Sequence, residues 1–282
     1  MPTKSYSLEN YRAFPDRTSI GIKPLTLVFG YNSAGKSALL RWLPLLRDST
    51  NHTGPLPINL NSAALRGGTF ADLISKFTSN PTISFSITEA DFEVHYTIRN
   101  IPEKTKQIVE RLQIRHSNGR VDFLEWFPSE KSDDQYRISS NGIESISDLF
   151  FDGLYPDQER TTDKSAVAIS LISSRLLRRW SENIYWLQAN RAIPKRKEAY
   201  TGSFREIAPD GEGITQLLVS EESGGSDVIQ ALSKWYETAT GFRLSLQRGA
   251  FLSTELFSFC LAAAGQSIEL ADRNDTAVYS AR

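Results

Sequence analysis

A phosphate-binding motif stands at residues 30–37, which read Gly30-Tyr31-Asn32-Ser33-Ala34-Gly35-Lys36-Ser37. The octapeptide matches the full G-x-x-x-x-G-K-[ST] pattern. An apolar run at 25–29 precedes it, and a helix-forming run at 38–43 follows it. A strand, a glycine loop and a helix in this order are the context in which the motif binds phosphate, so the motif and its flanks together predict a nucleoside triphosphate site.

The two glycines allow the backbone to curl so that successive N–H groups point at phosphate oxygens. The start of the following helix adds free N–H groups and a partial positive charge. Lys36 is the expected catalytic residue, reaching the β- and γ-phosphates, and Ser37 is the expected ligand of Mg²⁺. The alternative is a glycine-rich turn that matches the pattern by chance. We expect ATP to be bound by Gly30, Asn32, Ser33, Ala34, Gly35, Lys36, Ser37 and Ala38.

The composition is that of an ordinary globular protein. The chain has 282 residues, of which 40% are hydrophobic and 23% charged, and its net charge is −1. Without a basic excess, any nucleic-acid contact would need a local patch. The lone cysteine, Cys260, cannot form an internal disulfide. This fits a reduced, cytoplasmic setting. The sequence shows no apolar signal region at its start and no apolar stretch long enough to span a membrane.

Hydrophobic periodicity predicts a mixed α/β fold and not a simple alternation of strands and helices. Apolar runs or period-two alternation predict strands at 5–9, 18–22, 25–29, 82–87, 92–98, 108–115, 121–127, 136–139, 184–187, 242–248, 255–262 and 266–271. Helical patterns predict a first helix at 35–46, with Pro44 as its kink or end, a helical stretch at 142–182, and helices at 213–219 and 226–240. Within the long helical stretch, three arginines lie close together, and they form either a solvated face or a basic patch: Arg175, Arg178 and Arg179.

The first 47 residues carry a family resemblance as well as a motif. Asn10-Tyr11-Arg12-Ala13-Phe14, a following strand, the run at 25–29 and the phosphate loop resemble the ABC-type ATPase heads of the SMC and RecF group. They look closest to the AAA-labelled bacterial relatives of the OLD family. The resemblance implies a P-loop NTPase of ABC-ATPase type, with a mixed sheet, an antiparallel β-subdomain and a helical subdomain. It also implies that Arg12 contacts the phosphate or base of the nucleotide, the alternative being a surface strand residue.

Two further stretches are similar to segments of the same ATPases. In residues 185–194 and 207–214, Arg191 stands where the family has an arginine, although Asn190 replaces an expected proline. Arg191 would lie near the nucleotide or at a dimer interface, or else form a structural salt bridge. Residues 67–73 fall where these heads place a glutamine loop, but they contain no glutamine. There, Asp72 is a candidate to orient Mg²⁺ or water.

The resemblance predicts one ATPase head over residues 1–282. Its expected parts are a phosphate-loop lobe at 1–60, an antiparallel β region at 61–140, a helical region at 141–240 and returning strands at 241–282. The sequence offers no convincing signature motif and no Walker B strand ending in two acids. We therefore expect an incomplete head, either the amino-terminal lobe of a longer head or a truncated protein, that hydrolyses ATP weakly on its own.

The family context implies a function. Such heads dimerise around two ATP molecules, and hydrolysis switches a bound partner or a nucleic-acid-processing activity. The resemblance therefore implies a homodimer or higher oligomer, a partner nuclease or effector protein, and a role in bacterial phage defence or DNA repair. Two alternatives stay open: a regulatory or scaffold protein that binds ATP without hydrolysing it, and a P-loop kinase.

Overall fold

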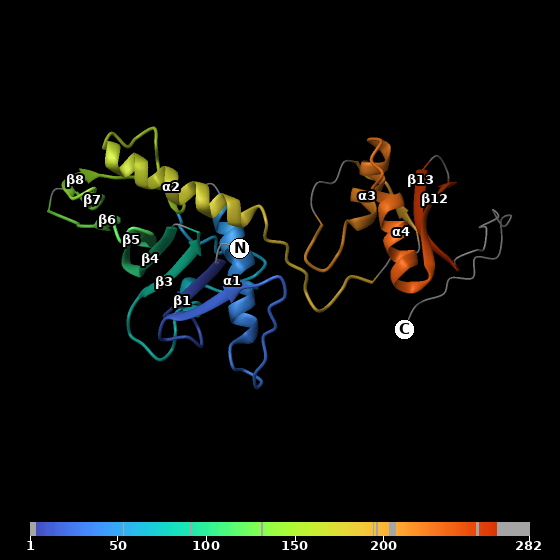
Figure 1. Ribbon diagram of the computed structural model, residues 1–282, viewed down its shortest axis with the longest axis horizontal. Helices are drawn as coiled ribbons and strands as arrows, with labels where there is room; N and C mark the ends of the chain where they lie inside the picture. Colours follow the sequence, from blue (N-terminus) through green and yellow to red (C-terminus); the bar gives the residue numbers. More distant parts are fainter. Residues whose placement is uncertain are drawn as a thin grey trace. The chain divides into compact units, whose positions relative to one another are not determined.

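The computed structural model describes residues 4–52, 54–90, 92–130, 132–193, 195, 197–202, 207–251 and 254–263. The chain divides into two units, Met1–Tyr185 and Trp186–Arg282 (Figure 1). Both units combine antiparallel strands with helices, so the fold is mixed α/β with one large antiparallel sheet. In the described part of the chain, no helix is long and apolar enough to cross a membrane.

An eight-stranded antiparallel sheet forms the first unit, in the order β2-β1-β3-β4-β5-β6-β7-β8. Its strands are β1 (Lys4–Glu9), β2 (Thr18–Ile22), β3 (Thr82–Glu89), β4 (Phe92–Ile101), β5 (Lys106–His116), β6 (Val121–Trp126), β7 (Gln135–Ser140) and β8 (Ile143–Asp148). Short pieces accompany them: the 3₁₀ turns η1 (Phe70–Asp72) and η2 (Pro102–Lys104), and the pair β9 (Phe151–Asp152) and β10 (Tyr155–Pro156). The period-two runs from 5–9 to 136–139, except 25–29, are confirmed as strands.

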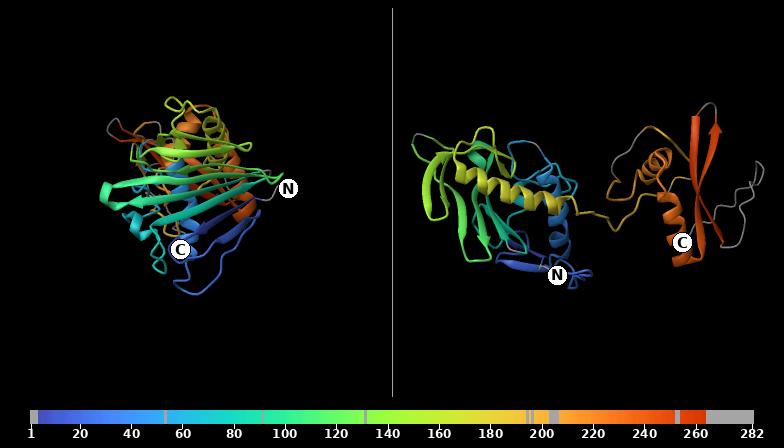
Figure 2. Two further views of the ribbon diagram at one scale, coloured as in Figure 1. Left: turned by 90° about the vertical axis from the view of Figure 1, so that its left-hand side faces the viewer. Right: turned by 45° about the horizontal axis from the view of Figure 1, so that its top comes forward.

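Two helices pack against the sheet. The first, α1 (Lys36–Thr50), follows the glycine loop, and the second, α2 (Lys164–Ser181), lies across the strands (Figure 2). Asp163 caps α2 by accepting bonds from the N–H groups of Ser165 at 2.8 Å and Ala166 at 3.0 Å. Such a cap satisfies donors that have no partner inside the helix.

The prediction that α1 ends near Leu46, with Pro44 as a kink or end point, is wrong about the end. The helix continues through Pro44 to Thr50. Proline removes the N–H that would bond the carbonyl four residues earlier, here that of Leu40. Leu40 lies on the outer side of α1 and is 51% exposed. Water can therefore reach that carbonyl, and packing of the opposite face holds the helix together.

The prediction of a helical stretch beginning at 142 is also wrong in its first part. Strand β8 occupies Ile143–Asp148, and α2 begins only at Lys164. Asn141 and Gly142 both have positive φ, 53° and 77°, and they close the hairpin between β7 and β8. An Asn-Gly pair between two strands is the strongest short hairpin signal, because both central residues of its turn need positive φ.

Two predicted strands, 25–29 and 184–187, are absent. Neither run pairs with any strand in the described residues. Leu25, Leu27, Tyr185 and Leu187 are all more than 60% exposed. Apolar runs of this kind form strands only where a sheet supplies hydrogen bonds and covers the side chains, so strand propensity did not decide these segments.

An aromatic series connects α1 to the sheet. The Trp42 ring lies 5.1 Å from Tyr11 and 5.0 Å from Phe85, and Phe85 stacks on Tyr96 at 5.0 Å. All four side chains are at most 1% exposed. Aromatic pairs at this separation add to the stabilisation from burial alone. The centre of the core therefore lies between α1, β3 and β4.

The opposite face of the sheet is polar. In register across it lie Ser7, Ser86, His95 and Gln113. Arg17 donates to the hydroxyl oxygens of Ser7 and Ser86 at 3.3 Å and forms an ion pair with Glu93. Cross-strand pairs of this kind stabilise a sheet whose second face is open to water.

The second unit contains a three-stranded antiparallel sheet in the order β11-β13-β12. Its strands are β11 (Glu198–Ala199), β12 (Phe242–Phe251) and β13 (Thr254–Ala263), and its helices are α3 (Ile214–Ser223) and α4 (Val228–Thr240). The helices predicted at 213–219 and 226–240 and the strands at 242–248 and 255–262 are confirmed. The strand predicted at 266–271 lies outside the described residues.

Replacement of Phe85 by alanine removes the ring that joins Trp42 to Tyr96. We expect Phe85→Ala to lower the free energy of unfolding by about 3–5 kcal/mol, as large-to-small changes in a packed core do. Phe77→Ala is the matched control, since Phe77 is 78% exposed. It should change stability by about 0.5 kcal/mol or less. Urea unfolding followed by near-ultraviolet circular dichroism compares them, and equal losses would contradict the assigned core.

His95 predicts a pH dependence of stability. Burial, reinforced by the Arg17 guanidinium, lowers the pKa of His95 from 6.5 to about 4. The folded protein therefore favours neutral His95, and its stabilising contribution is complete above pH 6.5 and is lost as the pH falls towards 4. We expect His95→Gln to remove on the order of 1–3 kcal/mol of this acid sensitivity. Urea unfolding of the parent and of His95→Gln at pH 7 and pH 4.5 measures this acid sensitivity. An equal loss of stability between the two pH values in both proteins would refute the prediction.

Candidate functional site

Residues 30–37 form a tight loop that leads directly into α1. Ser33 and Gly35 have left-handed backbone conformations, with φ of 67° and 90°. The N–H of Ala34 donates to the carbonyl oxygen of Tyr31 at 3.3 Å. The backbone thus curls over 31–35, which is the shape that turns successive N–H groups towards one point.

Gly35 is the N-cap of α1, and its environment admits no side chain. A Cβ atom at this position would lie 2.9 Å from Cβ of Ala13 and 3.0 Å from Cζ of Phe14. Both neighbours belong to the turn after β1, where Tyr11 and Phe14 exchange backbone hydrogen bonds of 2.9 and 2.8 Å. The end of the loop is therefore pressed against that turn, and glycine is required for space as well as for φ.

The amino end of α1 has the properties of an anion site. No side chain caps it, and its first turn contains no acidic residue. The Nζ atom of Lys36 donates to the carbonyl oxygens of Gly30 at 2.8 Å and Tyr31 at 2.6 Å, which places the ammonium against the loop. Ser37 is exposed in the first turn. Free N–H groups, a helix dipole and an ammonium group therefore occupy one place.

Two tyrosines, one in β1 and one in the turn after it, fix this end of α1. The Tyr6 hydroxyl donates to the carbonyl oxygen of Leu39 at 3.2 Å, and that of Tyr11 donates to Ala38 at 3.4 Å. Both tyrosines are almost completely buried. The position of Lys36 and Ser37 is thus set by the sheet through α1.

The approach to the loop differs from the sequence prediction. Residues 25–29 are not a strand, and Leu25, Leu27 and Phe29 are 74%, 63% and 83% exposed. In the described residues no backbone bond joins this run to the sheet. The loop is therefore anchored on its helix side, by α1 and the turn at Tyr11–Phe14.

Three arginines gather near α1: Arg12 from the turn after β1, Arg41 from α1 itself, and Arg66 from the loop before η1. Burial lowers the pKa of Arg41, and the nearby guanidinium groups of Arg66 and Arg12 lower it further. The Nε atom of Arg12 is buried and has no hydrogen-bond partner among the described residues. Mutual repulsion and an unpaired buried donor both favour the binding of an anion here.

Unusual backbone conformations place two of these arginines. Arg12 has φ 49° and Arg66 has φ 56°, both left-handed. The N–H of Arg12 donates to the carbonyl oxygen of Leu73 at 2.8 Å, which links the turn after β1 to η1. Left-handed conformations cost energy for residues with side chains and often mark functional positions.

Asp72 has a structural role in this region. Its Oδ2 atom accepts bonds from the backbone N–H of Thr69 at 2.7 Å and from the Thr69 hydroxyl at 2.8 Å. These bonds lower the pKa of the Asp72 carboxyl, with smaller contributions from Arg12 and Lys76. The carboxylate closes the capping box of η1. The Oδ2 atom is thus bonded within η1, and the predicted role of Asp72 towards Mg²⁺ or water stays a prediction.

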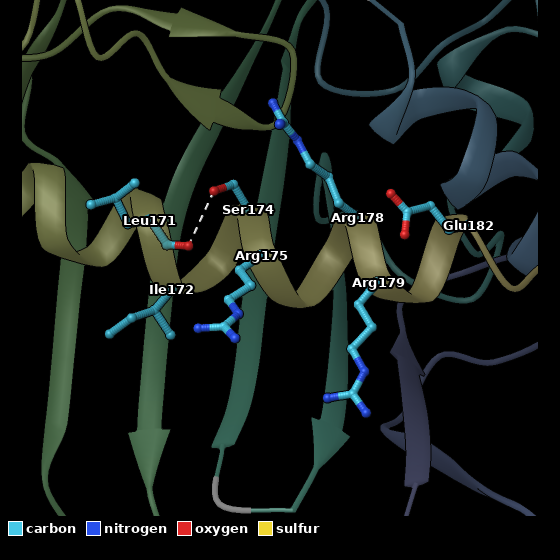
Figure 3. A pocket seen from close by; sticks show the side chains of 7 residues that line it. All are labelled: Leu171, Ile172, Ser174, Arg175, Arg178, Arg179 and Glu182. Atoms are coloured by element: carbon cyan, nitrogen blue, oxygen red, sulfur yellow. Dashed lines mark hydrogen bonds between the residues drawn. The ribbon is translucent and has the colours of Figure 1, made fainter.

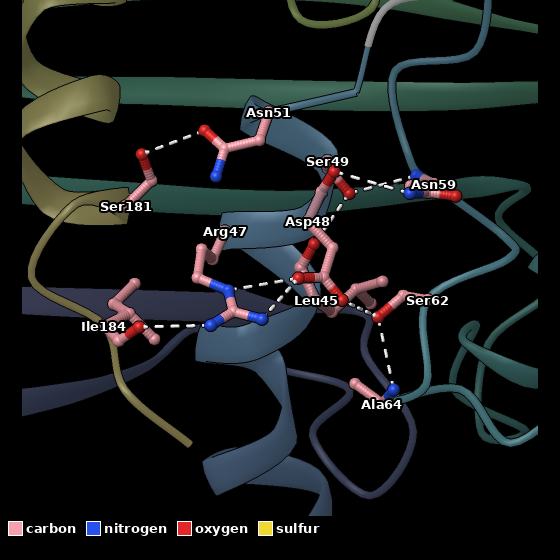
Figure 4. A network of polar contacts seen from close by, with 10 residues as sticks. All are labelled: Leu45, Arg47, Asp48, Ser49, Asn51, Asn59, Ser62, Ala64, Ser181 and Ile184. Carbon is pink, nitrogen blue, oxygen red and sulfur yellow. Dashed lines mark hydrogen bonds and ion pairs between the residues drawn. The ribbon is translucent and has the colours of Figure 1, made fainter. Parts of the chain in front are cut away.

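A polar network holds the loop that carries Arg66 against the carboxyl end of α1 (Figure 4). Asp48 pairs with Arg47 at 3.0 Å and accepts a bond from the Ser62 hydroxyl at 2.6 Å. The hydroxyl of Ser62 in turn accepts from the N–H of Ala64 at 3.2 Å, two residues before Arg66. The network therefore helps to position Arg66 relative to α1.

The structure adds two arginines to the surroundings of the predicted site. Arg41 and Arg66 were not identified from the sequence, although Arg66 directly precedes Gly67-Gly68 and Arg41 lies five residues after Lys36. Arg12 and Arg66 both lie near Arg41. Arg191 belongs to the second unit, where the N–H of Ala192 bonds the carbonyl oxygen of Asp210 at 2.9 Å. The two stretches joined by the resemblance, 185–194 and 207–214, thus meet there.

These residues fit a triphosphate. The loop ends in Gly35 at the uncapped start of α1, and Arg12 offers a buried Nε–H that has no partner among the described residues. Mg²⁺ would be held by Ser37 together with phosphate oxygens and water, as Mg²⁺ usually is when few protein ligands are present. No protein-family model matches the chain, and no curated protein sequence matches it.

Gly35→Ala tests the close approach between the loop and the turn after β1. The substitution adds a Cβ 2.9 Å from Ala13 at a φ of 90°. We expect it to lower the free energy of unfolding by about 1–3 kcal/mol. Gly21→Ala is the control, because a Cβ there meets nothing within 4 Å. Chemical unfolding compares the two variants, and equal stability would show that the loop does not have the described packing.

Proposed function

We propose that this chain binds ATP through the loop at 30–37 and belongs to the ABC-type ATPase heads that its sequence resembles. The observation that carries the proposal is the curled loop ending in Gly35 at the uncapped start of α1, with Lys36 directed onto the loop. Backbone N–H groups at a helix start and a lysine beside them are the parts with which phosphate loops bind a triphosphate.

The arginines strengthen the proposal. Arg12 and Arg66 both bring positive charge close to Arg41 of α1, the helix that begins at Lys36, and Asp72 is an acid whose carboxylate responds to Arg12. A triphosphate would relieve the repulsion among the guanidinium groups and give Nε of Arg12 an acceptor. Arginine is well suited to this, since its planar group binds phosphate with two parallel hydrogen bonds.

The loop and Lys36 have separate roles in the proposed binding of ATP. The loop N–H groups orient the phosphates, and the Lys36 ammonium exchanges the carbonyl oxygens of Gly30 and Tyr31 for phosphate oxygens. Bound Mg²⁺ supplies further neutralisation of phosphate charge. Hydrolysis also requires a group that positions water, and the nearby carboxylate of Asp72 is already bonded to Thr69. We therefore propose tight binding with slow turnover by this chain alone.

The resemblance extends the proposal to assembly. ABC-type heads close as dimers around two ATP molecules, and hydrolysis then switches a partner. We propose such a homodimer or higher oligomer in the cytoplasm, acting with an effector or nuclease in phage defence or DNA repair. A kinase is the weaker proposal, because strands β3 to β8 that follow the loop are all antiparallel and are not parallel βα units.

Lys36→Ala is the direct test of nucleotide binding. Removal of the ammonium should weaken Mg²⁺–ATP binding by about tenfold or more, or 1.4 kcal/mol, when measured by isothermal titration calorimetry. Lys23→Ala is the matched control, because Lys23 is exposed and its backbone N–H, which bonds Thr26, is kept. It should bind like the parent.

Phosphate release measured in parallel separates the alternatives. Slow turnover by the parent chain agrees with the proposal. ATP binding that survives Lys36→Ala unchanged would contradict the phosphate-loop assignment, and brisk turnover by the parent would contradict the proposed dependence on groups outside this chain.

A further inference from the structure

The outer side of α2 carries a shallow groove of about 730 Å³ that the proposed nucleotide site does not use. Its lining comes from the carboxyl-terminal two-thirds of the helix, and Figure 3 shows the side chains projecting to both sides of the helix. The residues that matter here run from Leu171 to Glu182. At 1.5 Å per residue this length corresponds to about three helical turns, or roughly 16 Å.

One end of the groove is apolar. Leu171 is 52% exposed, and Ile172 beside it is half-buried. The buried face of the same helix, which includes Ile169, Leu176 and Leu177, packs inward. Leu171 is therefore not needed for the core and is available to contact another molecule.

The middle of the groove is positively charged. Arg175, Arg178 and Arg179 project from it, and all three are exposed. The charge of Arg179 is partly neutralised by Glu89, since Nη2 lies 3.2 Å from Oε1 of that buried carboxylate. The guanidinium group of Arg178 lies 5.7 Å from the centre of the Tyr155 ring. In the part of the chain that the structure describes, neither Arg175 nor Arg178 has a carboxylate partner.

The helix end explains only part of this charge. Cations in the last turn of a helix interact favourably with its dipole, and Arg178 and Arg179 are in that turn. Arg175 lies six residues before the end at Ser181, beyond the reach of this effect. Its guanidinium is exposed, lies one turn after Leu171, and pairs with no carboxylate among the described residues, so it is open to pairing with an acidic partner.

We propose that this groove binds an acidic amphipathic α-helix of a partner protein. Leucine-like side chains of that helix would pack on Leu171 and Ile172, and its carboxylates would pair with Arg175 and Arg178. Helices commonly bind in grooves through residues spaced three, four and seven apart, and arginine is among the residues that dominate such interfaces. The inference is independent of nucleotide binding.

Charge and polarity favour a protein over a nucleic acid. The groove also has an apolar end at Leu171 and Ile172, which offers nothing to phosphates but can pack against apolar side chains. The whole chain has a net charge of −1, so it has no general attraction for nucleic acid. An acidic amphipathic helix can contact the apolar end with apolar side chains and the arginines with its carboxylates.

Fluorescence anisotropy with the full chain tests the proposal. The probe is a fluorescein-labelled peptide of two Leu-Glu-Ala-Ala-Leu-Glu-Ala heptads, which places leucine and glutamate on two adjacent stripes of one helix. We expect it to bind, and the same peptide with glutamine for glutamate to bind about tenfold more weakly. Binding should also weaken as salt is added, because the contacts are exposed charge pairs. Absence of binding, or equal binding of the two peptides, would overturn the proposal.

Variants assign the binding to the groove. We expect Arg175→Glu with Arg178→Glu to weaken binding by about tenfold or more while thermal unfolding stays unchanged. Lys164→Glu reverses a charge in the first turn of the same helix, outside the groove, and should change binding by less than about twofold. Equal effects of the two changes would overturn the assignment. Two other results would also overturn the assignment. In the first, the arginine variant abolishes binding of a fluorescent oligonucleotide but not of the peptide; in the second, it abolishes self-association of the chain but not peptide binding.

Discussion

The packing of Trp42 between Tyr11 and Phe85 is the contact on which the candidate site depends. It joins α1 to the turn after β1 and to the centre of the sheet, and the ring is completely buried. Lys36, Ser37 and Arg41 all project from the helix that this ring holds. Arg12 follows Tyr11 directly, so the same contact places the turn that closes against Gly35. Large aromatic side chains suit this role, since they bury much surface in a fixed geometry.

Positive charge is the second constraint. Helix α1 has an uncapped start that carries Lys36, and its Arg41 lies near two further arginines, Arg12 and Arg66, both of which have left-handed backbones. Such an arrangement costs stability through repulsion and backbone strain, and proteins retain costs of this kind chiefly at functional sites. The cost is consistent with a triphosphate as the missing counter-charge, which is the central proposal.

Features that depend on neighbouring residues in the sequence can be predicted from it, whereas features that depend on tertiary contacts cannot. Alternation in residues 82–139 is local, and it predicted strands β3 to β7 correctly. The hairpin signal at Asn141-Gly142 is equally local, but the helical pattern that follows it outweighs it in a prediction from sequence. The runs at 25–29 and 184–187 were misjudged because a strand also needs neighbours, which composition does not reveal. The motif identified Lys36, whereas the association of Arg66 with Arg41 and Arg12 depends on tertiary contacts and could not be predicted.

Competition among phosphate compounds tests the central claim most directly. If the loop and its cations recognise the phosphate chain, inorganic tripolyphosphate should displace a fluorescent ATP analogue from this protein, with ATP stronger than ADP and ADP stronger than AMP. Adenosine should have little effect. Displacement by adenosine but not by tripolyphosphate would mean that the base is recognised, and it would contradict a phosphate-binding role for residues 30–37.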